Sequence, residues 1–390
     1  MNDPMNERMP VYLDYAATTP VDPRVAAAMH ECLTLDGVFG NPASVHAYGQ
    51  MARARVERAR AQAAAMIHAP AQQLIWTSGA TESNNLAILG TARAMAKHGR
   101  HLISVRTEHK SVLDPCKRLE QEGFQVTLLD TDRDGLISPE RVRATLRDDT
   151  VLVSIMHANN EIGVVQDIGA IAQVCHARGT PLHVDAAQSA GKVQIDVAQL
   201  QCDLLSFTAH KLYGPKGIGA LYFAPARRAC LQPLIYGGGH ERGLRSGTLP
   251  VHQIVGFGLA CELAAAARVQ DAAHCERLRA RLWAGLSQID GALLNGHPTQ
   301  RVAGILNVSF PGVEGESLLM GLTELAVSTG SACNSDSDEP SYVLRALGRD
   351  TELAQSSLRF SVGRFSSDQD IDIAIAAVLR EVQRLRAAAA

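Results

Sequence analysis

The stretch that organises the chain is Ser206-Phe-Thr-Ala-His-Lys-Leu-Tyr-Gly-Pro-Lys-Gly217. The apolar run 204–207 predicts a buried strand, and the Gly- and Pro-rich end predicts a tight turn. Lys211 therefore leaves a buried strand, where an amine is unfavourable unless it is paired, neutralised or used covalently. We interpret Lys211 as a candidate Schiff-base lysine that anchors pyridoxal phosphate, with a solvated surface lysine as the alternative.

Short apolar runs precede this stretch, most of them separated by helical segments. With 204–207 included, they span 74–77, 101–105, 126–129, 151–156, 182–184 and 204–207. Alternation of strands and helices predicts an α/β fold in which helices cover both faces of a mostly parallel sheet. A seventh run, 219–223, follows after a loop too short for a crossover helix, so we expect this strand to be antiparallel.

The composition of the chain argues against several classes of protein. The 390 residues suffice for two domains, and 37 basic against 40 acidic residues leave no electrostatic footprint for nucleic acid. Residues 1–10 lack the pattern of a signal peptide, and no apolar stretch is long enough for a membrane span. The 8 cysteines include no CxxC pair, which argues against a zinc site or a disulfide framework. We expect a cytoplasmic protein with reduced thiols and no metal.

Polar residues follow the predicted strands, at the edge where open α/β sheets bind their ligands. Ser78-Gly-Ala-Thr-Glu-Ser83 follows the run 74–77 and leads into an apolar helix. It is either a phosphate cradle or an ordinary helix N-cap. His109 follows the run 101–105, and it either stacks on a cofactor ring and moves protons or is a surface histidine.

The next two strand ends add three further candidates. Asn160 offers uncharged donors to a phenolate or a carboxylate, although asparagine also suits a turn. Asp185 can hold a pyridine nitrogen protonated, or it can cap a helix. Gln188 is placed to donate to a ring oxygen. Together with Lys211, these strand ends carry a compatible set of parts for pyridoxal phosphate.

Several longer motifs resemble those of a known family. The most specific are Tyr12-Leu-Asp-Tyr-Ala-Ala-Thr-Thr-Pro20, Thr77-Ser-Gly-Ala-Thr-Glu-Ser83, Asn159-Asn-Glu-Ile-Gly163, His210-Lys-Leu-Tyr-Gly-Pro-Lys-Gly217 and Arg245-Ser-Gly-Thr248. Through them the chain resembles the cysteine desulfurases, pyridoxal-phosphate enzymes of the class V aminotransferase group, over about 11–385. The similarity is greatest to the housekeeping bacterial enzymes of iron–sulfur cluster assembly.

The resemblance implies a fold and an assembly. The fold is PLP fold type I, in which a large domain with a mostly parallel seven-stranded sheet is joined to a smaller C-terminal α+β domain. We expect the large domain at 16–262 and the small domain at 1–15 and 263–390, with a mobile cysteine loop at about 327–341. The assembly is a homodimer with shared active sites.

The resemblance also implies cofactor contacts. Lys211 resembles the Schiff-base lysine, and His109 the stacking and proton-transfer histidine. The implied cofactor-binding residues are Ala80, Thr81, Asn160, Asp185, Gln188, Thr208, His210, Lys211 and Thr248. Among them, Asp185 matches the partner of the pyridine nitrogen and Gln188 the donor to the ring oxygen. Thr248 resembles a residue that reaches the phosphate in the partner subunit.

Substrate contacts follow in the same way. Asn160 and Arg359 resemble the pair that grips the substrate carboxylate, a role that suits a bidentate arginine. Arg359 is alternatively a structural ion-pair residue. Cys333 lies among small and polar residues, which predicts an exposed thiol suited to nucleophilic attack. The other seven cysteines lie mostly in helical or apolar contexts, typical of core packing.

The implied reaction takes sulfur from L-cysteine, releases L-alanine and leaves a persulfide on Cys333. The sulfur then passes to an acceptor, either an iron–sulfur scaffold protein or a relay for tRNA thiolation, and Cys333 is a candidate transient ligand of a nascent cluster. The alternatives are a selenocysteine lyase, an aminotransferase, and a sulfur-relay or scaffold protein without turnover. No direct contact with nucleic acid or membrane is expected.

Overall fold

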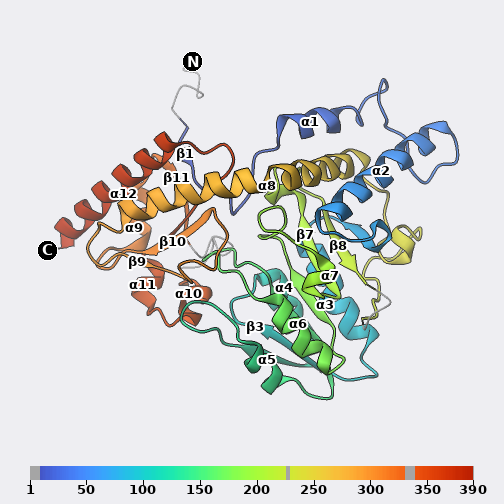
Figure 1. The fold of residues 1–390 in the computed structure, drawn as a ribbon, viewed down its shortest axis with the longest axis horizontal. Helices are drawn as coiled ribbons and strands as arrows, with labels where there is room; N and C mark the ends of the chain where they lie inside the picture. The colour runs from blue at the N-terminus through green and yellow to red at the C-terminus, as the bar shows by residue number, and fades with distance from the viewer. Residues whose placement is uncertain (1–8, 225–228, 330–338, 390) are drawn as a thin grey trace.

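A seven-stranded sheet forms the centre of the larger part of the molecule (Figure 1). The computed structural model describes residues 9–224, 229–329 and 339–389. The strands lie in the order β2 (Leu74–Thr77), β8 (Gly219–Phe223), β7 (Leu204–Thr208), β6 (Leu182–Asp185), β5 (Thr150–Met156), β3 (His101–Val105) and β4 (Gln125–Leu129). Strand β8 pairs antiparallel with both neighbours, and the remaining pairs are parallel. The predicted α/β fold, including the antiparallel strand, is confirmed.

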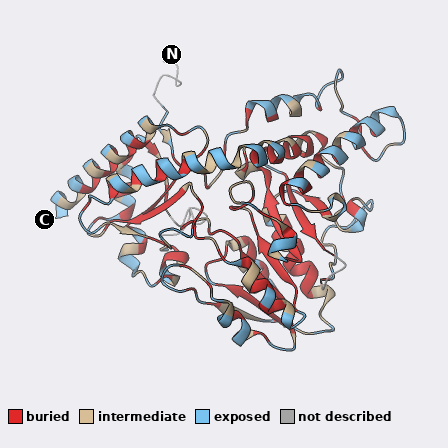
Figure 2. Ribbon diagram, in the orientation of Figure 1, coloured by how far each residue is buried: buried red, intermediate tan, exposed pale blue. Residues whose placement is uncertain are grey.

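Helices cover both faces of this sheet because its strands are apolar on both faces. In β2, Leu74 and Trp76 pack into one buried cluster and Ile75 into another on the opposite face. The first face is covered by α2 (Ala47–Met66), α6 (Ile168–Ala177) and the N-terminal half of α8 (Val251–Leu286). The second face is covered by α3 (Ala80–Ala94) and α4 (Lys110–Gln121). Figure 2 shows the resulting buried sheet between partly exposed helices.

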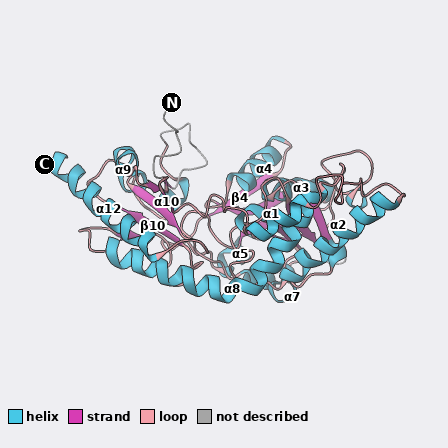
Figure 3. Ribbon diagram, turned by 90° about the horizontal axis from the view of Figure 1, so that it is seen from above, coloured by secondary structure: helices cyan, strands magenta, loops and turns pink. Residues whose placement is uncertain are grey.

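Helix α8 (Val251–Leu286) connects the two parts of the molecule. The sequence predicts a helix to about residue 267 and a second one from residue 274, but the structure has one uninterrupted helix of 36 residues. Near its start, Phe257 packs into the core of the large sheet, and near its end Leu278 and Leu282 pack into a separate core. The domain boundary expected at 262/263 therefore falls inside this helix. Figure 3 shows α8 running along both parts.

A smaller antiparallel sheet forms the second part. Its strands lie in the order β12 (Ser328–Thr329), β13 (Ser357–Ser361), β10 (Ile305–Ser309) and β9 (Leu293–Leu294). Helix α12 (Asp368–Ala389) packs on it through Ile371 and Val378. Strand β1 (Val11–Tyr12) pairs parallel with β11 (Leu325–Ala326), so the N-terminal strand lies in this part. The following residue, Leu13, is fully buried in its core.

The remaining helices in the described part of the chain are short. They are α1 (Pro23–His30), η2 (Ala71–Gln73), α5 (Pro139–Thr145), α7 (Val197–Leu200), η3 (Ala209–Lys211), η4 (Glu241–Gly243), α9 (Gly315–Gly321), α10 (Tyr342–Ala346) and α11 (Thr351–Gln355). Within the part of the chain that the structure describes, no helix combines the length and apolarity needed to cross a bilayer. Six described cysteines are buried, as expected for core packing, whereas Cys230 is exposed.

Candidate active site

One cavity of about 540 Å³ lies at the carboxyl edge of the large sheet, where the second part of the molecule adjoins it. Ten residues predicted from the sequence line it: Ala80, Thr81, His109, Asn160, Asp185, Gln188, Thr208, His210, Lys211 and Arg359. Backbone from residues 16–18 closes one side. Thr248 is exposed and does not line this cavity. Cys333 lies outside the described residues.

Lys211 lies at the end of β7, in the single turn η3. Its Nζ donates to the carbonyl oxygens of Ala16 and Ala17, the second at 2.8 Å. These contacts hold the amine against the N-terminal segment inside the cavity. The alternative of a surface lysine in bulk water does not match this placement, because the side chain is partly buried and faces backbone carbonyls.

The N-terminus of α3 forms one end of the cavity. Gly79 precedes the helix with φ +155°, a value that favours glycine, and a Cβ built on it would approach the hydroxyl of Thr208 to 3.9 Å. The neighbouring Gly219 packs so tightly that a Cβ there would lie 2.7 Å from the Cα of Gly79. The first N–H groups of a helix have no partner within the helix and attract anions. Close backbone packing thus places the N-terminus of α3 beside Thr208.

Charges around this helix end are arranged to leave it attractive to an anion. The Glu82 carboxylate accepts from the backbone N–H of Ser78 at 2.7 Å and pairs with Arg245 at 2.8 Å, so its charge is compensated. At His210, burial first and then the neighbouring lysine ammonium groups lower the pKa to about 4. His210 is therefore neutral at neutral pH, and its Nδ1 lies 3.2 Å from the hydroxyl of Thr18.

The middle of the cavity contains Asp185, whose side chain is held by two donors. Asn84 donates to its Oδ2 at 2.7 Å, and the backbone N–H of Ala187 donates to its Oδ1 at 2.9 Å. Gln188 donates from Nε2 to the carbonyl oxygen of Ala16 at 2.8 Å and accepts from Lys192 at 2.8 Å. The Gln188 amide is thereby oriented with its NH₂ group toward the segment that also receives Lys211. Sequence reasoning missed Asn84 and Lys192, which carry no motif signal separate from their neighbours.

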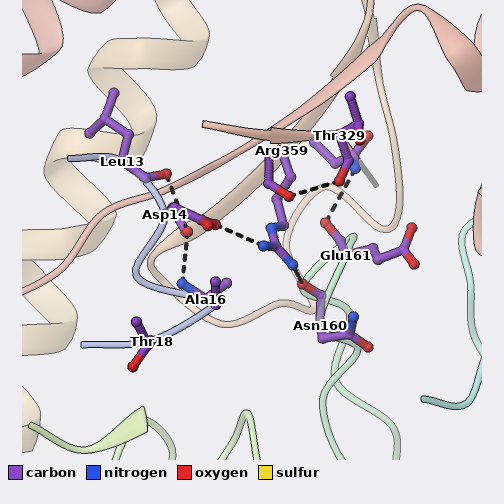
Figure 4. A network of polar contacts seen from close by, with 12 residues as sticks. Leu13, Asp14, Ala16, Thr18, Asn160, Glu161, Thr329 and Arg359 are labelled. Atoms are coloured by element: carbon purple, nitrogen blue, oxygen red, sulfur yellow. Dashed lines mark hydrogen bonds and ion pairs between the residues drawn. The ribbon is translucent and has the colours of Figure 1, made fainter. Parts of the chain in front are cut away.

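The opposite end of the cavity is built around Arg359 from β13 (Figure 4). Its Nη2 pairs with Asp14 at 2.7 Å, and its Nη1 donates to the carbonyl oxygen of Asn160 at 2.9 Å. Arg359 is 3% exposed. Its Nε and the Oδ1 of Asn160 have no hydrogen-bond partner among the described residues. Arg359 is thus both an ion-pair residue and a lining residue, so the two readings of the sequence are compatible.

Residues on either side of 330–338 lie near this end. Thr329 belongs to β12, which pairs with β13 next to Arg359, and Figure 4 shows Thr329 beside Arg359 and Glu161. On the other side, the hydroxyl of Ser341 donates to the Glu161 carboxylate. Burial raises the pKa of Glu161 to about 7. The described ends of the chain around position 333 therefore both contact the arginine end of the cavity.

The family follows from a comparison over most of the length. The model of the family described as aminotransferase class-V matches residues 11–373. The chain belongs to this family. Within it, the chain is 57% identical to "Cysteine desulfurase IscS" of Shewanella baltica (strain OS223) and 55% identical to that of Shewanella sp. (strain ANA-3). Each comparison spans 380 residues, 97% of this chain and 94% of the relative.

Solved structures of related class-V proteins have the same fold. A structure titled "NIFS-LIKE PROTEIN" superposes with a TM-score of 0.89 at 35% identity, covering 97% of this chain and 99% of the other. A structure titled "SspA in complex with cysteine" has a TM-score of 0.80 at 38% identity, covering 91% and 99%. The predicted PLP fold type I and the resemblance to cysteine desulfurases are confirmed. Within the described residues, no group of three or more potential ligand side chains is arranged to hold a metal ion.

Proposed function

We propose that the protein is a cysteine desulfurase, which takes the sulfur of L-cysteine and releases L-alanine. The observation that carries this proposal is the convergence of Lys211, Asp185 and Arg359 on one cavity. An amine, a nitrogen partner and a carboxylate-binding cation are the groups needed to process an amino acid on pyridoxal phosphate. The near full-length identity to proteins named cysteine desulfurase supports the same reading.

The residues present fit pyridoxal phosphate, which the family implies. The α3 N-terminus with Ala80 and Thr81, together with Thr208 and His210, would hold the phosphate, and Asp185 would hold the ring nitrogen. The buried Oδ1 of Asn160 has no hydrogen-bond partner among the described residues, which supports a ligand that carries a donor at this point. When bound, the cofactor supplies an aldehyde that condenses with amines and a ring that delocalises an electron pair at the substrate Cα.

The chain's own residues would then bind the substrate and move protons. Arg359, held by Asp14, and Asn160 bind the carboxylate of L-cysteine. The Lys211 amine and the His109 ring, which line the same cavity, take and return protons at the substrate carbon. Asp185 would keep the ring nitrogen of the cofactor protonated. Burial of Arg359 and Asp185 excludes water from these contacts.

Sulfur transfer is assigned to Cys333. Its thiolate attacks the sulfur of the bound L-cysteine, an S–S bond forms, and the C–S bond breaks with its electron pair retained on carbon. That carbon takes up a proton, which completes L-alanine, and the persulfide stays on Cys333. The placement of Thr329 and Ser341 at the arginine end supports a thiol within reach of the substrate.

The assembly and the sulfur acceptor form the finer part of the proposal. Exposed Thr248 sits on the loop that Arg245 ties to Glu82, which supports its role at the phosphate of a second subunit in a homodimer. The persulfide sulfur would pass to an iron–sulfur scaffold protein or to a relay for tRNA thiolation. We place the protein in the cytoplasm, where its buried thiols stay reduced.

The test is to mix the purified protein with L-cysteine and measure alanine and sulfide. We expect equal amounts of both with a thiol reductant, loss of both in Cys333→Ala, and unchanged visible absorbance in that variant. A selenocysteine lyase would instead keep its full rate on selenocysteine after Cys333→Ala. An aminotransferase would need a keto acid as amino-group acceptor and would convert L-cysteine into the corresponding 2-keto acid, which keeps its sulfur, instead of alanine. No turnover of any of these substrates would identify a binding protein.

A further inference from the structure

A continuous hydrogen-bonded chain joins Asp185 to His109 beneath the cavity. Asn84 of α3 donates from Nδ2 to Asp185 Oδ2 at 2.7 Å and to the hydroxyl of Ser111 at 2.8 Å. The Ser111 hydroxyl lies 2.8 Å from His109 Nδ1, and the backbone N–H of Ser111 donates to the same nitrogen at 3.1 Å. Asn84 is fully buried, and Ser111 and Asp185 are nearly so. Asp185 and His109 are thus linked by hydrogen bonds through Asn84 and Ser111, two residues that the sequence motifs do not single out.

The direction of every hydrogen in this chain follows from its first member. A carboxylate only accepts, so Asp185 requires the NH₂ group of Asn84. The second N–H of Asn84 then points to the Ser111 oxygen, which accepts it and directs its own hydrogen to His109. The backbone N–H of Ser111 likewise requires a lone pair on Nδ1. His109 Nδ1 is therefore the accepting nitrogen, and in the neutral ring the proton is on Nε2.

The remaining atom of Asn84 is left without a partner by this orientation. Its Oδ1 is buried and has no hydrogen-bond partner among the described residues. In a reversed amide the oxygen could accept from the Ser111 hydroxyl, but it would also lie 2.7 Å from the Asp185 carboxylate oxygen, where two acceptors repel each other. The orientation of Asn84 is thus imposed by Asp185 and passed on to Ser111.

We propose that Asn84 and Ser111 are positioning residues that transmit the ionised state of Asp185 to His109 and hold its ring as the Nε2–H tautomer. The relay couples the residue that supports the ring nitrogen to the residue that moves protons. Its catalytic consequence rests on the proposed function, whereas the tautomer itself does not.

The test is Ser111→Ala, read by ¹⁵N NMR of the histidine rings in the purified protein, with His109→Gln to assign the signal. We expect Nδ1 of wild-type His109 to be the unprotonated nitrogen. Loss of the Ser111 hydroxyl should raise the His109 pKa by about 0.5–1 unit, since one neutral hydrogen bond to the uncharged ring is removed. The backbone N–H at position 111 remains in the variant and keeps the ring in place.

Other charges near His109 are the same in both proteins. They are Asp185 through the relay, Lys211 and Arg359 in the same cavity, and Glu161, whose pKa a protonated His109 would lower. Glu108, next to His109 in sequence, and Lys110 are also retained. A difference between the His109 titrations of the wild type and Ser111→Ala therefore reports the effect of the Ser111 hydroxyl.

Two further variants complete the experiment. Ser111→Thr keeps a hydroxyl and should restore the wild-type His109 pKa. Ser138→Ala removes a serine hydroxyl that caps the start of α5, away from the cavity, and should leave both the His109 pKa and the rate unchanged. On L-cysteine, Ser111→Ala should lower kcat about two- to tenfold with KM within twofold.

A proton on Nδ1 in the wild type, or a His109 pKa unchanged by Ser111→Ala, would overturn the relay. Failure of the protein to form alanine would instead overturn the proposed function and leave the tautomer measurement standing.

Discussion

The two ends of the cavity are built in different ways. The ring end consists of Asp185, Asn84, Ser111 and His109, which hydrogen-bond to one another. The arginine end consists of Asp14, Asn160 and Arg359 and leaves two buried polar atoms without partners among the described residues. A buried polar atom that lacks a partner destabilises the empty site by about 1–3 kcal/mol, which binding of a complementary ligand would recover.

The difference indicates which kind of ligand each end of the cavity can bind. The residues of the ring end are tied to one another by hydrogen bonds, and one buried atom, Asn84 Oδ1, has no partner among the described residues. This end is held in place before any substrate arrives, so it is suited to a permanently bound group. The arginine end has hydrogen-bonding capacity left over, so it is suited to a substrate that comes and goes. Variants at the two ends should therefore separate cofactor retention from substrate affinity.

The largest effect is expected from Lys211, which lies between the two ends. Lys211→Ala removes the amine that would both anchor the cofactor and move a proton. Alanine formation should fall by at least about 10³-fold, within the range known for loss of a proton-transfer group. Initial rates and the visible absorbance band measure the two roles.

A Lys211→Ala protein that keeps its visible band and more than a tenth of its rate would contradict the assignment of this lysine. Circular dichroism of the same sample serves as the control for folding.

The ionisation of Glu161, beside the arginine end, can be tested through the stability of the protein. Burial raises the pKa of Glu161 to about 7, against 4.5 for an exposed glutamate, so the folded state favours the protonated form. As pH rises from about 4.5 to about 7, the unfolded chain releases this proton more readily, and the free energy of unfolding should fall. The loss is up to about 3 kcal/mol, and it levels off above pH 7.

Glu161→Gln removes this dependence. The unfolding free energy of the wild type should therefore fall relative to that of the variant as the pH rises from about 4.5 to about 7. Urea denaturation at pH 4.5, 5.5, 6.5 and 7.5 measures it. Glu120→Gln on the exposed face of α4 is the matched control. A difference between wild type and Glu161→Gln that is constant with pH would show that Glu161 ionises normally in the folded protein.

Arg359 tests the arginine end directly. Arg359→Gln removes a charge-assisted contact to the substrate carboxylate, which is worth about 1.5–3 kcal/mol. KM for L-cysteine should rise about 10- to 100-fold, while the visible absorbance stays as in wild type because the ring end is untouched.

Arg380→Gln on α12 removes a surface ion pair with Glu324 and should change neither value. Loss of the cofactor from Arg359→Gln, with KM unaltered in the remaining fraction, would mean that this arginine supports the ring end instead.

The smallest effect is expected from Asn160. Asn160→Ala removes one neutral hydrogen bond, whereas the Asn160 carbonyl oxygen that accepts from Arg359 is backbone and remains. KM for L-cysteine should rise about two- to tenfold. A rise larger than that of Arg359→Gln, measured under the same conditions, would reverse the ranking of these two residues.

Much of the ring end could be predicted because its residues follow consecutive strands of one sheet. Asp185 ends one apolar run and His109 follows another within a few residues, and parallel strands bring their carboxyl ends to the same edge. Asn84 and Ser111 could not be predicted in the same way. They lie inside or at the start of helices, and their contact depends on how α3 packs against α4.

The sequence by itself determined the order of strands and helices, the antiparallel β8 and the chemistry at the strand ends, because these follow from local apolar patterns and short turns. Only the tertiary structure decided that α8 is one helix, that Arg359 pairs with Asp14, and that Asn84 links Asp185 to Ser111. Those contacts join residues far apart in the chain, and their geometry depends on packing between elements that no local pattern records.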